Sequence, residues 1–189
     1  MKNNRILLNE LITINGINSY LVNIFLILIG TFILAISAKV QVPFWPVPMT
    51  MQTFVVFLIG MTYSVRLSFL TLLTYLAEGA FGLPVFAAGG GLAYLVGPTA
   101  GYLYGMLVAA IVISFFAGKG FGVSYIKTTL TLLLGSIIIF SFGIFYLGSL
   151  IGFEKAFQAG LIPFIPSEIF KIALAVSIIP TVYNYIRLK

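Results

Sequence analysis

Apolar residues fall into long stretches along this 189-residue chain, and each stretch is followed by a shorter connection. A helix needs roughly 20 mostly apolar residues to cross the hydrocarbon core of a bilayer, so each stretch is a candidate transmembrane helix. The first twenty residues mix polar and apolar side chains, and we expect an interfacial segment over 1–20 ahead of a single six-helix domain over 21–189. The predicted spans are 21–38, 47–64, 67–81, 99–117, 128–152 and 167–186.

The basic residues indicate how these spans are oriented. With both termini in the cytoplasm, only Lys39 and Lys155 fall on the outer side. The reverse orientation would break the positive-inside rule, so we expect cytoplasmic N- and C-termini. The basic residues then on the inner side are Lys2, Arg5, Arg66, Lys119, Lys127, Arg187 and Lys189.

The three predicted outer connections, 39–46, 82–98 and 153–166, are apolar and rich in proline or glycine rather than short and polar. Irregular backbone at membrane depth requires protein or a cavity around it, so we expect these connections to fold back over the bundle. The glycine run 89–91 allows positive φ and a close approach to a ligand. We interpret 82–98 as an apolar lid, with a loose connector as the alternative, and its candidate ligand contacts are Phe86, Gly90, Gly91 and Tyr94.

Composition supports a membrane protein and excludes several kinds of chemistry. Hydrophobic residues make up 61% of the chain and charged residues 7%, against about 25% charged in soluble domains. The chain has no cysteine, no histidine and only four acidic residues, which excludes thiol and histidine catalysis and Cys/His zinc sites. We therefore expect no enzyme, no cofactor and no metal. The scattered basic residues do not form a nucleic-acid-binding face.

Glu168 and Lys171 are the main candidates for a binding site. They lie three positions apart in the first turn of the sixth span, so they share one helix face. Charges within a membrane are costly and usually line a site, although an interfacial pair that reaches out to water is the alternative. Pro166 and Ser167 place a helix N-terminus here, whose free N–H groups favour a polar or anionic partner.

Neutral polar residues and a lone acid extend this candidate site. Thr50 and Gln52 open the second span in "PVPMTMQTF" and suit an uncharged polar group such as a urea, with helix capping after Pro48 as the alternative. Glu78 lies near the outer end of the third span. A proton relay, a ligand contact and a partner for Lys39 or Lys171 all remain open for Glu78.

Small residues in the first span predict a close helix contact. Gly30, Thr31, Ala35 and Ala38 include pairs at four-residue spacing, which allows another helix to approach closely. We expect a partner-helix face at Thr31, Ala35 and Ala38, with packing inside the chain as the alternative.

Three segments resemble one known family. "VPFWPVPMTMQTF", "GLPVFAAGGGLAYLVGPTAGYLYG" and "PSEIFKIALA" are similar, in this order, to the BioY family, the biotin-specific substrate-capture (S) component of energy-coupling-factor (ECF) transporters. The likeness runs from about residue 25 to residue 180. The family's Pro-Gly-Asp pattern in the sixth helix, with a lysine three residues on, is here Pro166, Ser167, Glu168 and Lys171.

The resemblance implies an all-α integral membrane protein of six transmembrane helices with the ECF S-component fold. It implies biotin uptake in the bacterial plasma membrane, with a transmembrane coupling protein and two cytoplasmic ATPases as partners. Glu168 would accept the ureido N–H groups, Lys171 or Thr50 would donate to the ureido carbonyl, and Lys39 or Lys171 would face the carboxylate tail. The alternatives are an S component for a different vitamin and a membrane assembly subunit that transports nothing.

Overall fold

The computed structural model describes residues 19–187, and the regular structure within them is helical apart from one small hairpin, which confirms the all-α prediction. In the hairpin, β1 (Gln41–Val42) pairs antiparallel with β2 (Met49–Thr50). Three short 3₁₀ turns, η1 (Leu92–Val96), η2 (Phe121–Val123) and η3 (Ile162–Phe164), lie in the connections. The α-helices are α2 (Ser19–Lys39), α3 (Gln52–Thr62), α4 (Val65–Ala80), α5 (Ala100–Gly118), α6 (Tyr125–Ile151), α7 (Phe153–Gly160) and α8 (Ile165–Arg187).

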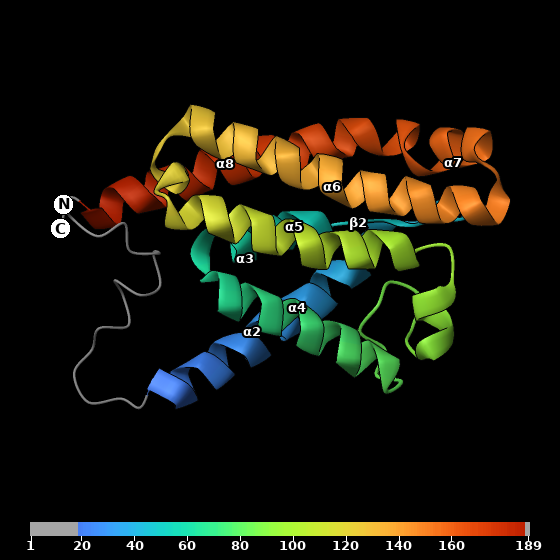
Figure 1. Ribbon diagram of the computed structural model, residues 1–189, viewed down its shortest axis with the longest axis horizontal. Coiled ribbons are helices and arrows are strands. Elements are labelled where there is room, and N and C mark those ends of the chain that lie inside the picture. Colours follow the sequence, from blue (N-terminus) through green and yellow to red (C-terminus); the bar gives the residue numbers. More distant parts are fainter. Residues whose placement is uncertain (1–18, 188–189) are drawn as a thin grey trace.

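The helices form three layers, with α6, α7 and α8 in one, α3 and α5 in the middle, and α2 and α4 in the third (Figure 1). Helix α5 packs most extensively against α6 and also contacts α3 and α4. The α3–α4 and α5–α6 turns lie at the left end of the bundle in Figure 1. The α4–α5 connection and α7 lie at the opposite end, where the hairpin points. We call this opposite end the lid end, and the connection 82–98 the lid loop.

Glycines bring α5 and α6 into close contact. A β-carbon on Gly105 of α5 would lie only 2.9 Å from the Cα atom of Ile139 on α6, and one on Gly143 of α6 would meet the ring of Tyr102. Small residues of this kind let transmembrane helices approach at backbone distance, where dispersion contacts are strongest. This close packing holds the middle of α6, including Ser136, near the other helices of the site.

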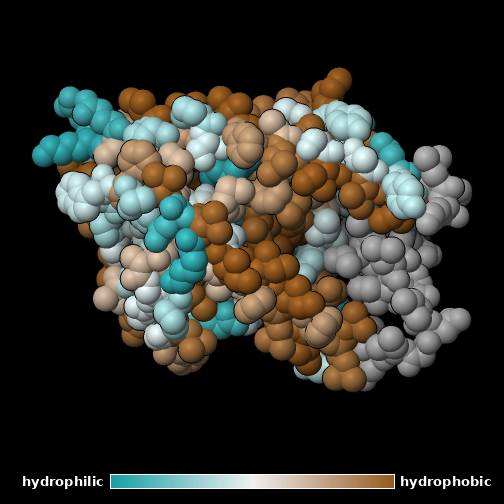
Figure 2. Space-filling view, turned by 180° about the vertical axis from the view of Figure 1, so that it is seen from behind, coloured by the Kyte–Doolittle hydropathy of each residue, from teal (hydrophilic) through white to brown (hydrophobic). Residues whose placement is uncertain are grey.

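Within residues 19–187, four helical segments are long and apolar enough to cross a membrane, so the chain is a multi-pass membrane protein. They are Tyr20–Lys39, Ala100–Gly118, Tyr125–Ile151 and Phe153–Ile186, the last of which contains α7 and all but the last residue of α8. Many large hydrophobic side chains on these helices are exposed, and Figure 2 shows hydrophobic residues over much of one face. Exposed apolar surface of this extent is typical of contact with lipid rather than water.

The predicted second span, 47–64, is wrong at its start. Helix α3 begins only at Gln52 and has 11 residues, which corresponds to roughly 16 Å of helix. Met49 and Thr50 pair with Val42 and Gln41 in the hairpin instead. Pro46 and Pro48 explain the difference, because proline disfavours a helical conformation in the residue before it and lacks a backbone donor.

The predicted interfacial segment lies mostly outside the described residues. Residues 1–18 are not described, and Ser19 and Tyr20 already belong to α2.

The small residues of α2 pack mainly inside the protein, which corrects the predicted partner face. Thr31 is 3% exposed and Ala38 is fully buried. Ala35 is partly buried against the core, and a β-carbon on Gly30 would lie 2.6 Å from the Thr71 methyl group of α4. The four-residue spacing therefore serves the contact of α2 with its own neighbours, and Thr31 and Ala38 are not accessible to a partner in this arrangement.

Candidate functional site

A cavity of about 40 Å³ lies where α3, α5, α6 and α8 meet the lid loop. Its wall has a polar side and a larger aromatic and apolar side. The polar side consists of Thr50, Gln52, Thr53, Thr99, Glu168 and Lys171. The rings and the thioether on the other side belong to Phe86, Tyr94, Tyr102, Met106, Phe140 and Phe164. A mainly apolar cavity with a few convergent polar groups is the usual form of a small-molecule site.

A buried ion pair dominates the polar side. Lys171 Nζ lies 2.9 Å from Glu168 Oε2, and the two residues are 2% and 5% exposed. The alternative in which these side chains reach out to water is therefore excluded for this structure. Burying a charge is tolerated only when it is paired and hydrogen-bonded, and both conditions are met here.

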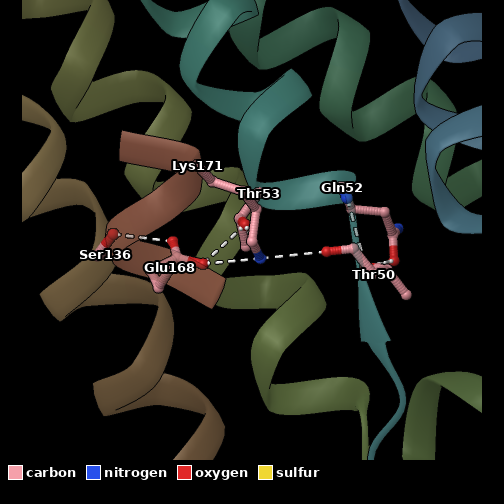
Figure 3. A network of polar contacts seen from close by, with 6 residues as sticks. All are labelled: Thr50, Gln52, Thr53, Ser136, Glu168 and Lys171. Carbon is pink, nitrogen blue, oxygen red and sulfur yellow. Dashed lines mark hydrogen bonds and ion pairs between the residues drawn. The ribbon is translucent and has the colours of Figure 1, made fainter. Parts of the chain in front are cut away.

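Threonine and serine side chains from two other helices complete the pair (Figure 3). The Thr53 hydroxyl of α3 donates to Glu168 Oε2 at 2.9 Å, and the Ser136 hydroxyl of α6 donates to Oε1 at 2.9 Å. Lys171 Nζ donates to Thr53 Oγ1 at 2.8 Å and to the Thr50 carbonyl oxygen at 3.1 Å. The network thus joins α3, α6, α8 and β2 around one carboxylate.

Local sequence explains why the pair stands at the start of α8. Pro163 lies in η3, and Pro166 lies in the first turn of α8, where a missing backbone N–H costs nothing. Glu168 is the acidic residue of that first turn, so the positive end of the helix dipole stabilises its charge. The i, i+3 spacing then brings Lys171 onto the same face.

The ring of Phe86 connects the lid loop to the cavity wall. This ring is fully buried. It stacks on Tyr94 with 4.9 Å between centroids and meets Tyr75 edge-on at 5.4 Å. A β-carbon on Gly79 of α4 would overlap the Phe86 ring, so a glycine is needed there to admit it.

Gly90 and Gly91 shape the lid loop rather than line the cavity. Gly91 has φ +100°, a conformation that favours glycine, and its N–H donates to the Gly79 carbonyl oxygen at 2.7 Å. At Gly90 a β-carbon would overlap the Leu83 carbonyl group. The expectation of positive φ in the glycine run is confirmed at Gly89 and Gly91.

The structure brings together six of the ten predicted ligand-contact residues. The cavity wall includes Thr50, Gln52, Phe86, Tyr94, Glu168 and Lys171. Lys39 does not line the cavity, but its Nζ atom donates to the Phe86 carbonyl oxygen at 2.6 Å. Glu78 is partly buried and lies outside the wall, like Gly90 and Gly91.

Several residues of the site carry no signal in the sequence that would single them out. Ser136 lies in the middle of α6 and differs in no local feature from the other serines of that helix. Tyr102 and Phe164 are two of many aromatic residues, and they stack at 6.5 Å between centroids. Across residues 19–187, no three carboxylate, histidine or cysteine side chains gather as a metal site.

The fold is shared with a solved structure of defined class. The crystal structure of the S-component for biotin from an ECF-type ABC transporter superposes with a TM-score of 0.78 at 24% identity. The match covers 89% of this chain and 94% of that chain. The chain therefore has the fold of an ECF S-component.

Sequence comparison then defines the family. The model of the BioY family matches residues 9–188, and the chain belongs to this family, which confirms the resemblance of the three segments. The probable biotin transporter BioY of Rickettsia prowazekii is 35% identical over 95% of this chain and 91% of its own length. The probable biotin transporter BioY of Pyrococcus horikoshii is 42% identical over 76% of this chain and 85% of its own length. The biotin transporter BioY of Thermotoga maritima is 36% identical over 78% of this chain and 87% of its own length.

Proposed function

We propose that this chain captures biotin at the extracellular side of the plasma membrane for uptake into the cell. The observation that carries the proposal is the buried Glu168–Lys171 pair at one side of an aromatic cavity, directly beneath a glycine-shaped loop. The names of its relatives as biotin transporters support the choice of substrate. The cavity suits a ligand with a small polar head and an apolar body.

Biotin matches this wall group by group. Its ureido ring offers two N–H donors and one carbonyl acceptor, and its fused thioether ring is apolar. A carboxylate has about four acceptor positions, and Glu168 uses three of them, for Ser136, Thr53 and Lys171. One acceptor position thus remains for a ureido N–H. Lys171 uses all three of its N–H donors. To donate to the ureido carbonyl, it must therefore give up its hydrogen bond to the Thr50 or the Thr53 oxygen.

The cavity must enlarge to admit this ligand. Its 40 Å³ hold about one water molecule, whereas small-molecule sites measure roughly 300–1,000 Å³. The Phe86 ring is large enough to make this room by moving, and it belongs to a connection rather than to a helix. We expect this ring to withdraw when the lid loop opens for biotin to enter, and to pack against the bound ligand when the loop closes again.

The S-component works, in this proposal, with an ECF coupling protein and two cytoplasmic ATPases in the bacterial plasma membrane. Six passes with both termini in the cytoplasm fit the charges, with the hairpin and α3 together forming the second pass. Arg66, Lys119 and Lys127 belong to the α3–α4 and α5–α6 end, and Lys39 and Lys155 to the lid end. This distribution follows the positive-inside rule when the lid end faces outward.

A ligand panel tests the proposal directly. Biotin should raise the melting temperature of the purified protein in detergent, because a ligand that binds only the folded state stabilises it. Thiamine and riboflavin serve as the comparison. A shift with one of these and none with biotin would identify an S-component for another vitamin, and no shift with any vitamin would favour an assembly subunit without a ligand.

We expect Lys39 to recognise the carboxylate tail, since its ammonium group lies at the lid carbonyl of Phe86. Lys39→Gln should weaken binding of biotin about threefold to tenfold, the effect of losing one exposed charge contact, and leave binding of the neutral biotin amide nearly unchanged. Lys155→Gln, also exposed at the lid end, is the matched control. Titration calorimetry with both ligands measures the difference, and an equal loss for acid and amide would reject this role.

A further inference from the structure

Three side chains hold the first half of the lid loop, at residues 85–87, through its backbone carbonyls. Lys39 Nζ donates to Phe86 O at 2.6 Å, and Gln41 Nε2 donates to Ala87 O at 3.3 Å. The Tyr75 hydroxyl donates to Val85 O at 2.9 Å. Lys39 and Gln41 are exposed, so water can replace their bonds. Tyr75 is 1% exposed, so its hydroxyl, unlike the other two donors, has little access to water that could replace the bond.

Tyr75 is also connected to the ion pair. Its hydroxyl accepts a hydrogen bond from Gln52 Nε2 at 2.8 Å, and Gln52 Oε1 accepts one from the Thr50 hydroxyl at 3.0 Å. The Thr50 carbonyl oxygen in turn accepts from Lys171. A run of hydrogen bonds, joined at Thr50 by the residue's own covalent bonds, therefore leads from Val85 in the lid loop to the polar side of the cavity.

These contacts exist while the cavity is too small for a ligand. The lid loop must open once for a ligand to enter and again for it to leave. Because Val85 and Phe86 are adjacent, withdrawal of the Phe86 ring from the cavity strains or breaks the bond between Tyr75 and Val85. That bond opposes both openings alike.

We infer that Tyr75 is a positioning residue that latches the lid loop and sets the rates of ligand entry and release rather than the affinity. This inference rests on the proposed capture of biotin beneath the lid loop. Loss of the latch destabilises the closed loop whether the cavity is empty or filled. Both rate constants then rise together, and their ratio, the dissociation constant, changes little.

Tyr75→Phe tests the latch, because phenylalanine keeps the ring against Phe86 and removes only the hydroxyl. Tyr104→Phe is the matched control, since the Tyr104 hydroxyl donates to Leu95 O in the same lid loop at 2.7 Å but is exposed. We expect association and dissociation of labelled biotin to accelerate roughly fivefold to tenfold in Tyr75→Phe, as for one lost hydrogen bond. The dissociation constant should move less than about threefold, and Tyr104→Phe should change either rate less than about twofold. Unchanged rates, or weaker binding with unchanged association, would overturn the latch.

A second measurement needs no ligand. The chain has no cysteine, so Ala87→Cys places a single thiol on the cavity-facing side of the lid loop, at a residue that is 7% exposed. Its reaction with a small maleimide should be roughly fivefold to tenfold faster in the Tyr75→Phe background than in the native or Tyr104→Phe background. Equal rates in all three would overturn the latch even if biotin binds. Faster labelling without any biotin binding would uphold the latch and reject biotin as the ligand.

Discussion

Glu168→Ala is expected to weaken biotin binding at least a hundredfold and to lower the melting temperature of the unliganded protein. Glu168 accepts hydrogen bonds from Ser136 and Thr53 and pairs with Lys171. Its loss therefore leaves a buried ammonium without its counter-charge, which typically costs about 3–5 kcal/mol. Loss of the ureido acceptor weakens binding further, and about 2.7 kcal/mol corresponds to a hundredfold. Calorimetric titration and thermal unfolding measure the two effects separately.

A charge-balanced variant separates ligand recognition from folding. Glu168→Gln combined with Lys171→Met removes both charges, and replacing a buried pair by neutral groups is often neutral for stability. We expect the melting temperature to return towards the native value while biotin binding stays lost. Glu154→Ala, an acid of α7 that is exposed, is the control for the single substitution. Native affinity in the charge-balanced variant would remove the ion pair from the proposed site.

Gly79→Ala is expected to hold the lid loop open and to weaken biotin binding roughly tenfold to a hundredfold. A β-carbon at this position overlaps the Phe86 ring, and the Gly91 N–H that bonds to the Gly79 carbonyl lies in the same loop. Forcing an extra methyl group into a packed contact typically costs about 1–3 kcal/mol. Because the loop rests on this contact, we expect the empty lid loop to stand open in this variant, so that part of the binding free energy of biotin is used to close it and the affinity falls. The dissociation rate of labelled biotin should rise accordingly.

Gly97→Ala is the matched control for this substitution. It adds the same methyl group at the end of the same lid loop, where a β-carbon would have ordinary contacts of 3.4 Å to Ala93 O and 3.5 Å to Tyr94 O. Its φ of −85° is open to any residue. We expect near-native binding in Gly97→Ala. Equal effects of the two alanines would show that the fit of Phe86 against α4 does not govern closure.

Features that depend on neighbours along the chain could be predicted from the sequence. The shared face of Glu168 and Lys171 follows from their spacing on one helix, and their pairing at 2.9 Å agrees with it. The apolar stretches predicted the helices because lipid demands long apolar runs. The start of α3 was predicted wrongly, since hydropathy does not distinguish the apolar strand at Met49 from a helix.

Contacts between distant segments required the folded chain. Ser136 donates a hydrogen bond to Glu168, which lies 32 residues further along the chain. Tyr75 donates one to the Val85 carbonyl oxygen only because the lid loop folds back over α4. The small residues of α2 could have formed a face for a partner helix or packed inside the chain. The close contact of Gly30 with Thr71 of α4 shows that they pack inside the chain.

The amino-acid sequence by itself determined the membrane class, the family and the charged pair of this protein. Each depends on residue type and on spacing within one segment. Only the tertiary structure decided which hydroxyls surround the carboxylate, how closely Phe86 packs against α4 and which face of α2 is buried. The physical reason is that helix rotation and packing distance follow from the fit of all side chains at once, which no single segment specifies.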